Sequence, residues 1–221
     1  MAEKLRIGVL ASGGGTNLQS IIDGCQNGNI DAEIVTVISN NPTSGALSRA
    51  NNAGIATQCI NHRSFDKRDD FDTKVVAALK DNNVQLVVLA GFMRIIGQRF
   101  LDAFPGRIMN IHPALLPAFP GLHVQQKALD YGARFAGCTV HFVDGGVDTG
   151  PIIAQAVVPV LDNDTEETLA ARILVQEHRI YPEAIQWFAQ GAISIVGRKV
   201  IVATQKQDPT LELINPPLNN S

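Results

Sequence analysis

Short apolar runs that alternate with amphipathic stretches constrain the fold of this chain more than any other feature. The apolar runs indicate buried strands, and they lie at 5–12, 33–40, 55–60, 84–92 and 107–112. Between them, apolar residues recur three and four positions apart, as helices require. Strands that alternate with helices predict a mostly parallel sheet covered on both faces, which is a doubly wound α/β fold. After residue 137 the pattern changes to pairs of strands, so we expect a mixed or antiparallel C-terminal edge.

The length and composition of the chain fit one folded unit. Hydrophobic residues make up 45% of the 221 residues, which is enough for a substantial core. We expect a single domain over 1–205 and a loosely ordered tail over 206–221, in a stand-alone protein.

Charge, cysteines and the N-terminal residues disfavour several classes of protein. The formal net charge of −3 gives no basic excess, so no nucleic-acid partner is expected. The three cysteines lie far apart without a C-x-x-C pair, which fits reduced thiols rather than a zinc or disulfide framework. The first residues contain no signal-type cleavage region, and their apolar run is too short to cross a membrane. We therefore expect a cytoplasmic protein without a membrane partner.

The segment ASGGGTN, at 11–17, joins the first predicted strand to the first predicted helix. Glycines let the backbone approach an anion, and a helix N-terminus offers free N–H groups. The P-loop pattern fails here because its Lys-Ser/Thr pair is missing. The dinucleotide pattern fails because Leu18 replaces its third glycine and no acid follows the second strand. We favour a single phosphate held by residues 15–17; a tight turn without a ligand is the alternative.

The segment NIHPALLPAFPG, at 110–121, combines two polar side chains with three prolines. Residues two apart on a strand point to the same face, so Asn110 and His112 can converge on one reacting group. Pro113 holds His112 in the extended region, and the later prolines stiffen the chain beyond it. Such stiffness suits a preorganised site in which donors are already aimed. The alternative is a buried structural histidine beside a structural asparagine.

Two further segments carry candidate site residues. In DGGVDTGP, at 144–151, Asp144 or Asp148 could pair with His112, although an ordinary surface loop or a weak cation site is the alternative. The sequence offers no third ligand of matching spacing beside His141 and Asp144, so we expect no metal. His141 itself is expected to be structural or to support the catalytic residues rather than to be catalytic. The apolar run VVLAGFMRII, at 87–96, could line an apolar slot or simply pack in the core.

Five motifs in this order and spacing resemble the phosphoribosylglycinamide formyltransferase family. They are SGGGTNLQ (12–19), AGFMRI (90–95), NIHPALLPAFPGLH (110–123), HFVDGGVDTGP (141–151) and QEHRIYP (176–182). The resemblance runs from the first strand to about residue 190. It implies a Rossmann-like formyltransferase fold and an enzyme of purine synthesis. In that family, the formyl group of 10-formyltetrahydrofolate passes to the primary amine of glycinamide ribonucleotide. The resemblance implies these two small-molecule partners, no metal, nicotinamide or flavin, and a possible homodimer.

The resemblance also implies roles for individual residues. Asn110 would donate a hydrogen bond to the oxyanion of a tetrahedral intermediate, His112 would stabilise it as an imidazolium, and Asp148 would orient His112 and relay a proton. Residues implied in ribonucleotide binding are Gly15, Thr16, Asn17 and Glu177. Residues implied in folate binding are Arg68, Met93, Arg94, Ile95, Ile96, Asn110, Asp144, Gly145, Gly146, Val147 and Asp148.

Other functions remain open on the same residues. Formyltetrahydrofolate deformylase shares the Asn–His–Asp set but delivers the formyl group to water; it usually carries an additional N-terminal domain, whereas here the first strand starts at Leu5. Methionyl-tRNA formyltransferase carries a basic C-terminal domain, whereas only about thirty residues, without a basic excess, follow the long helix here. A non-catalytic folate or nucleotide binding module is the third alternative, because fold does not fix function. We favour the ribonucleotide transferase.

Overall fold

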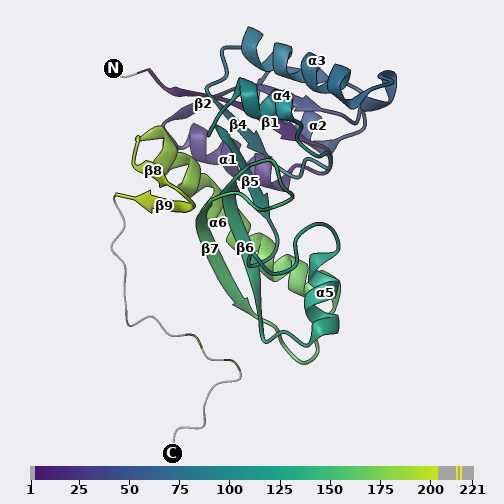
Figure 1. Cartoon of the computed structure of the whole chain (residues 1–221), viewed down its shortest axis with the longest axis vertical. Coiled ribbons are helices and arrows are strands. Elements are labelled where there is room, and N and C mark those ends of the chain that lie inside the picture. Colours follow the sequence, from purple (N-terminus) through teal and green to yellow (C-terminus); the bar gives the residue numbers. More distant parts are fainter. Residues whose placement is uncertain (1–2, 204–212, 214, 216–221) are drawn as a thin grey trace, which may run out of the picture.

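A seven-stranded sheet in the order β3-β2-β1-β4-β5-β6-β7 forms the centre of the molecule (Figure 1). The computed structural model describes residues 3–203, 213 and 215. The strands of the sheet are β1 (Leu5–Ala11), β2 (Ala32–Ser39), β3 (Thr57–Cys59), β4 (Leu86–Leu89), β5 (Ile108–His112), β6 (Phe135–Phe142) and β7 (Ile152–Pro159). The first five are parallel to one another, whereas β6 is antiparallel to β5 and β7 is antiparallel to β6. The predicted doubly wound sheet with a mixed edge is therefore confirmed.

Six α-helices connect or follow these strands. They are α1 (Thr16–Gln26), α2 (Gly45–Asn52), α3 (Arg68–Asp81), α4 (Gln98–Ala103), α5 (Val124–Tyr131) and α6 (Glu166–Ala189). A short 3-10 helix, η1 (His62–Ser64), precedes α3, and a separate hairpin of β8 (Ile193–Val196) and β9 (Lys199–Val202) follows α6. In Figure 1, β6 and β7 extend away from the parallel strands, with α5 near their far end.

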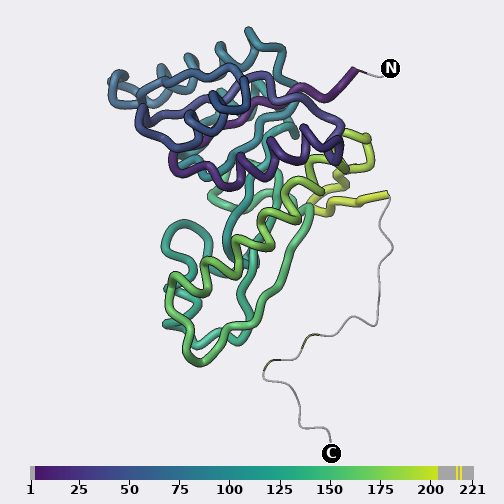
Figure 2. Tube along the Cα trace, turned by 180° about the vertical axis from the view of Figure 1, so that it is seen from behind, coloured from purple at the N-terminus to yellow at the C-terminus, as the bar shows by residue number. Residues whose placement is uncertain are grey.

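The sheet divides two hydrophobic cores because successive side chains of a strand point to opposite faces. On β4, Leu86 and Val88 belong to the core shared with α1, α2 and α6, whereas Val87 and Leu89 belong to the core shared with α3 and α4. All four side chains are buried, which explains why this strand is apolar throughout rather than alternating. Figure 2 shows α6 running diagonally across the first of these faces, beside α1.

The chain reverses its direction of travel across the sheet between β1 and β4. The strands β2 and β3 lie on one side of β1, and β4 and β5 lie on the other, so β1 and β4 are neighbours. Their carboxyl ends are joined by a hydrogen bond from the Ser12 N–H to the Gly91 carbonyl (3.0 Å). A crevice at such a reversal is the usual ligand site of an open α/β sheet.

Two strands are shorter than the sequence pattern predicts. The run 84–92 forms a strand only at Leu86–Leu89. Gly91 has a φ of 72°, which turns the chain out of the sheet. Ala90 lies beyond the strand but is nevertheless buried. The apolar run is therefore longer than the strand because burial continues past the strand's last residue. The run 55–60 forms a strand only at Thr57–Cys59, at the sheet edge.

The long helix α6 begins at a capping box, in which the side chains of Thr165 and Thr168 each accept from the other's backbone N–H. Among the described residues, no helix is both long and apolar enough to cross a membrane. The predicted tail 206–221 lies outside the described residues, apart from Leu213 and Asn215.

Candidate active site

The glycine-rich turn after β1 presents unpaired amides at the start of α1. Gly15 occupies the N-cap position with φ 75° and ψ 31°. A Cβ at Gly15 would lie 2.7 Å from the Ala46 Cα, so only glycine fits there. Within the described part of the chain, none of the N–H groups of residues 13–18 donates a hydrogen bond to a protein acceptor. Such a row of free amides at a helix N-terminus is suited to a phosphate or another anion.

Asn17 joins this turn to α6. Its Nδ2 donates to the Glu177 Oε2 at 2.7 Å. Burial raises the pKa of Glu177, and the hydrogen bond from Asn17 counteracts part of that rise. The Asn17 Oδ1 is buried and has no partner among the described residues. The sequence-predicted ribonucleotide residues therefore lie together, with one acceptor oxygen left for a donor on a ligand.

Asn110, His112 and Asp148 also lie together, at the carboxyl end of β5. The His112 Nδ1 lies 3.4 Å from the Asp148 Oδ2, and the His112 Nε2 donates to the Phe119 carbonyl at 2.9 Å. The same Asp148 oxygen accepts from the Gly121 N–H at 2.9 Å. Because both ring nitrogens of His112 face acceptors, the arrangement suits a doubly protonated imidazolium.

His141 is a neighbour of this set, and the sequence indicated a structural or supporting role for it rather than a catalytic one. Its Nδ1–H donates to the Phe142 carbonyl at 2.8 Å, so its Nε2 is free to accept, and the Asn110 Nδ2 lies 3.2 Å from that Nε2. Burial lowers the pKa of His141, which favours this neutral form. His141 and Asn110 are paired directly across β5 and β6. Only the register of an antiparallel pair reveals this contact, and the sequence contains no signal for that register.

The structure of the loop between β6 and β7 shows which of its two acids, Asp144 or Asp148, pairs with His112. Asp148 pairs with His112, whereas the Asp144 Oδ1 accepts from the Gly146 N–H (3.1 Å) and the Thr149 hydroxyl (2.6 Å) of the same loop. The Asp144 side chain therefore stabilises the loop internally. Asp148 has a φ of 54°, a conformation that non-glycine residues rarely adopt. From outside, the Arg198 Nη2 donates to the Thr149 carbonyl at 2.7 Å.

The segment 93–96 borders the site with exposed apolar side chains. Met93 is 64% exposed and Ile95 62% exposed. Val147, in the loop between β6 and β7, is 52% exposed. The Met93 N–H donates to the Ser12 Oγ at 2.8 Å, which ties the segment to the end of β1. Exposed apolar side chains gathered beside polar groups are typical of a ligand site.

Arg68, at the start of α3, lies beside this segment. Its Nε is 3.7 Å from the buried Asp72 carboxylate. Burial raises the pKa of Asp72, and the neighbouring Arg68 lowers it in part. A Cβ at Gly97 would lie 2.8 Å from the Arg68 Nη2 and 2.3 Å from the Asp72 Oδ2. The predicted folate residues of α3 and the 93–96 segment are therefore adjacent.

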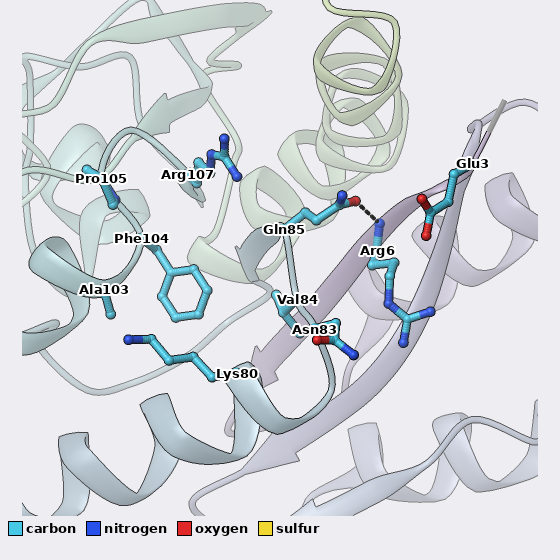
Figure 3. Close-up of a pocket in the computed structure, with 10 residues that line it drawn as sticks. All are labelled: Glu3, Arg6, Lys80, Asn83, Val84, Gln85, Ala103, Phe104, Pro105 and Arg107. Carbon is cyan, nitrogen blue, oxygen red and sulfur yellow. Dashed lines mark hydrogen bonds between the residues drawn. The ribbon is translucent and has the colours of Figure 1, made fainter.

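A depression of about 790 Å³ lies beside the amino ends of β1, β4 and β5, and we assign it no ligand. Arg6, Lys80 and Arg107 contribute its positive charge, but Figure 3 shows these groups on separate walls with their charged ends apart. Lys80 lies in the last turn of α3, where a cation compensates the negative end of the helix. The described residues contain no group of three or more His, Cys, Asp or Glu side chains that could hold a metal ion.

Comparison with known proteins identifies the family. The formyl transferase family model matches residues 5–185. The chain belongs to the formyl transferase family. The phosphoribosylglycinamide formyltransferase of Escherichia coli strain K12 is 44% identical to this formyl transferase over 191 residues, which cover 86% of this chain and 90% of that protein. The resemblance that the five motifs indicated is confirmed.

Two further comparisons place this formyl transferase among longer proteins and solved structures. The trifunctional purine biosynthetic protein adenosine-3 of Drosophila pseudoobscura pseudoobscura is 49% identical over 190 residues, but the match covers 85% of this chain and only 14% of that protein. The crystal structure of glycinamide ribonucleotide transformylase 1 from Symbiobacterium toebii superposes with a TM-score of 0.90 at 51% identity, covering 91% of this chain and 95% of that one.

Proposed function

We propose that this formyl transferase moves the formyl group of 10-formyltetrahydrofolate to the primary amine of glycinamide ribonucleotide, a step of purine synthesis. One observation carries the proposal: the Asn110, His112 and Asp148 side chains are held together at the end of β5 by the contacts His112–Asp148 and Asn110–His141. The names of the Escherichia coli and Symbiobacterium toebii relatives, which align over most of the chain, support formyl transfer to the same ribonucleotide acceptor.

The proposed reaction is direct transfer without a covalent enzyme intermediate. The neutral amine attacks the formyl carbon, and the formyl oxygen takes up the electron pair as a tetrahedral oxyanion. Asn110 has a second Nδ2 hydrogen, beyond the one directed at His141, for that oxyanion. Because both nitrogens of His112 already face acceptors, His112 acts through its positive charge. Collapse of the intermediate breaks the bond to N10 of the folate, which receives the amine proton through Asp148 and water.

The two substrates approach from different sides of this group. Gly15, Thr16 and Asn17 hold the phosphate of the ribonucleotide, and Glu177 meets its glycinamide end. The folate lies against the other side, with Arg68 at its glutamate tail. Its pteridine meets the backbone of the segment 93–96 and the loop 144–148, beside the exposed Met93, Ile95 and Val147.

A direct assay tests the function. Purified protein is mixed with 10-formyltetrahydrofolate and glycinamide ribonucleotide, and the formation of tetrahydrofolate is followed. We expect turnover that depends on the ribonucleotide. Turnover with water alone would replace the proposal with a deformylase. Binding of both ligands without any turnover would favour a non-catalytic module.

The proposal also covers the surroundings of the enzyme. It acts on two small molecules in the cytoplasm, without nucleic acid or a membrane. Light scattering of the purified protein at assay concentrations distinguishes a homodimer from a monomer.

A further inference from the structure

Two carbonyl groups of the glycine-rich turn are held by α2. The Gly13 carbonyl accepts from the Ser44 hydroxyl (2.8 Å) and from the Ala46 N–H (3.1 Å). The Gly14 carbonyl accepts from the Arg49 Nε (2.9 Å). We call Ser44, Ala46 and Arg49 together the α2 clamp. Three donors from one short helix thus fix two consecutive peptide groups of the turn.

The side chains of Ser44 and Arg49 do not make the hydrogen bonds that are usual for such residues at the ends of a helix. Ser44 is the N-cap residue of α2, a position at which serine usually accepts a hydrogen bond from its own helix, yet its side chain makes no capping bond. Arg49 lies in the last turn of α2, where cations usually bind their own helix's carbonyls. Its Nε instead reaches Gly14, and its Nη1 donates to the Gln19 Oε1 of α1 at 3.2 Å.

These contacts set the direction of the amides of the turn. In a trans peptide the carbonyl of one residue and the N–H of the next point in opposite directions. Holding the Gly13 and Gly14 carbonyls toward α2 therefore directs the N–H groups of Gly14 and Gly15 away from it. Neither N–H has a protein acceptor among the described residues. Two successive amides that point the same way form the concave anion site that a phosphate requires.

The turn and α2 also approach too closely for larger side chains. A Cβ at Gly45 would lie 3.0 Å from the Gly14 carbonyl oxygen, and a Cβ at Gly15 would lie 2.7 Å from the Ala46 Cα. Three successive glycines would otherwise leave the backbone free to sample many conformations. The close approach and the three hydrogen bonds fix one of them.

We propose that Ser44 and Arg49 are positioning residues that aim the amides of the glycine-rich turn at the 5′-phosphate of the acceptor, and so give the enzyme its preference for a phosphorylated substrate. The inference rests on the proposed function, whose acceptor carries that phosphate. A purely structural role for α2 makes a different prediction, because loss of packing would affect phosphorylated and unphosphorylated acceptors alike.

The experiment compares two acceptors, glycinamide ribonucleotide and the glycinamide riboside that lacks the phosphate. Arg49→Ala and Ser44→Ala are each expected to lower kcat/KM for the ribonucleotide by roughly three- to tenfold, the scale of one hydrogen bond. For the riboside, kcat/KM stays at the wild-type value, so the preference for phosphate falls. Arg49→Lys, which keeps a charged donor, recovers part of that preference. The charge-matched control is Arg107→Ala, because Arg107 lies beside the amino end of β5, and it leaves both values unchanged.

A measurement without turnover separates this inference from the proposed function. Inorganic phosphate is expected to raise the Tm of the wild-type protein, and to raise it less for Arg49→Ala. If phosphate binds in this way but no formyl transfer occurs, the proposed function is overturned and the α2 clamp stands. An equal loss of kcat/KM for both acceptors, or an unchanged phosphate preference in folded Arg49→Ala, would show that the α2 clamp does not position the turn for phosphate. Arg49 is only half-buried, so this variant decides the matter even if Ser44→Ala, with its buried side chain, fails to fold.

Discussion

Asp148 connects three parts of the site through a single carboxylate. Its Oδ2 faces the His112 Nδ1 and accepts from the Gly121 N–H, while its Oδ1 lies 3.8 Å from the His141 Nε2. An amide at this position can still accept from Gly121, but it removes the negative charge beside the His112 ring. The role of Asp148 is therefore separable from the local packing.

Asp148→Asn is expected to lower kcat by about 10²-fold or more, the scale on which loss of one preorganised electrostatic group is felt. Because the amide is nearly the same size, the Tm and the affinity for tetrahydrofolate stay close to wild type. Steady-state kinetics and calorimetry check both statements. Asp162→Asn is the matched control, since Asp162 is exposed and pairs only with Arg134 among the described residues. A kcat near that of wild type would remove Asp148 from the mechanism.

Glu177→Gln is expected to stabilise the protein at pH 8 while raising KM for the ribonucleotide. Burial raises the pKa of Glu177, so the folded protein binds this proton more tightly than the unfolded chain does. The charged form therefore costs stability above the folded pKa, and glutamine removes that cost, by about 0.5–2 kcal/mol. Thermal melts from pH 8 downward should show the advantage shrinking as wild-type Glu177 becomes protonated. A lower Tm for the variant at pH 8 would contradict the argument.

At the scale of elements, the glycine-rich turn and α6 cooperate through one side chain. Asn17→Ala removes the hydrogen bond to Glu177 at 2.7 Å, and with it the unpartnered Oδ1 offered to a ligand. We expect KM for the ribonucleotide to rise about tenfold, as for the loss of one hydrogen bond to a charged group, with a much smaller change for the folate. Initial-rate kinetics with each substrate varied in turn measure both values. Equal effects would mean that the turn is only structural.

The hairpin β8–β9 braces the loop that carries Asp148. Residues 145–147 are exposed, so polar contacts rather than packing keep the loop in place. Arg198→Ala removes the contact to the Thr149 carbonyl. We expect amide exchange in the loop to accelerate roughly two- to tenfold, the equivalent of one hydrogen bond, and kcat to fall with it. Hydrogen exchange followed by mass spectrometry measures the first effect. Lys199→Ala, at the start of β9 and next to Arg198, is the control. Exchange that changed only within 193–202 would show that the hairpin does not hold the loop.

On the scale of the whole molecule, Tyr181 ties the helical layer to the sheet. Its hydroxyl donates to the carbonyls of Leu89 (3.0 Å), the last residue of β4, and Met109 (2.9 Å), the second residue of β5. Burial raises the pKa of Tyr181 well above its usual value, so the hydroxyl keeps its proton. The helix thereby supplies a donor to two neighbouring strands of the sheet.

Tyr181→Phe is expected to destabilise the protein by about 1–3 kcal/mol, because two buried carbonyls lose their shared donor. For a chain of this size each kcal/mol corresponds to a fall in Tm of roughly 2–4 °C. Chemical denaturation and thermal melts give both values. A Tm equal to that of wild type would mean that water replaces the hydroxyl at both carbonyls.

The fold was predictable from local patterns, because apolar periodicity encodes strands, helices and the faces they bury. The position of Asn110 and His112 on one face followed from the same periodicity. Contacts that depend on how distant segments meet were not predictable. His141 lies opposite Asn110 only through the register of β6, and Arg49 reaches Gly14 only through the packing of α2 on the turn. Likewise, two acids four residues apart could both have paired with His112 until the path of the loop selected Asp148.

The hydrogen bond between Asn17 and Glu177 spans 160 residues of sequence. On a ribosome, the glycine-rich turn and the whole parallel part of the sheet emerge long before this carboxylate. A nascent chain can therefore form most of its sheet while the proposed acceptor site is still incomplete. If Asn17 and Glu177 act as proposed, we expect formyl transfer only after α6 has docked.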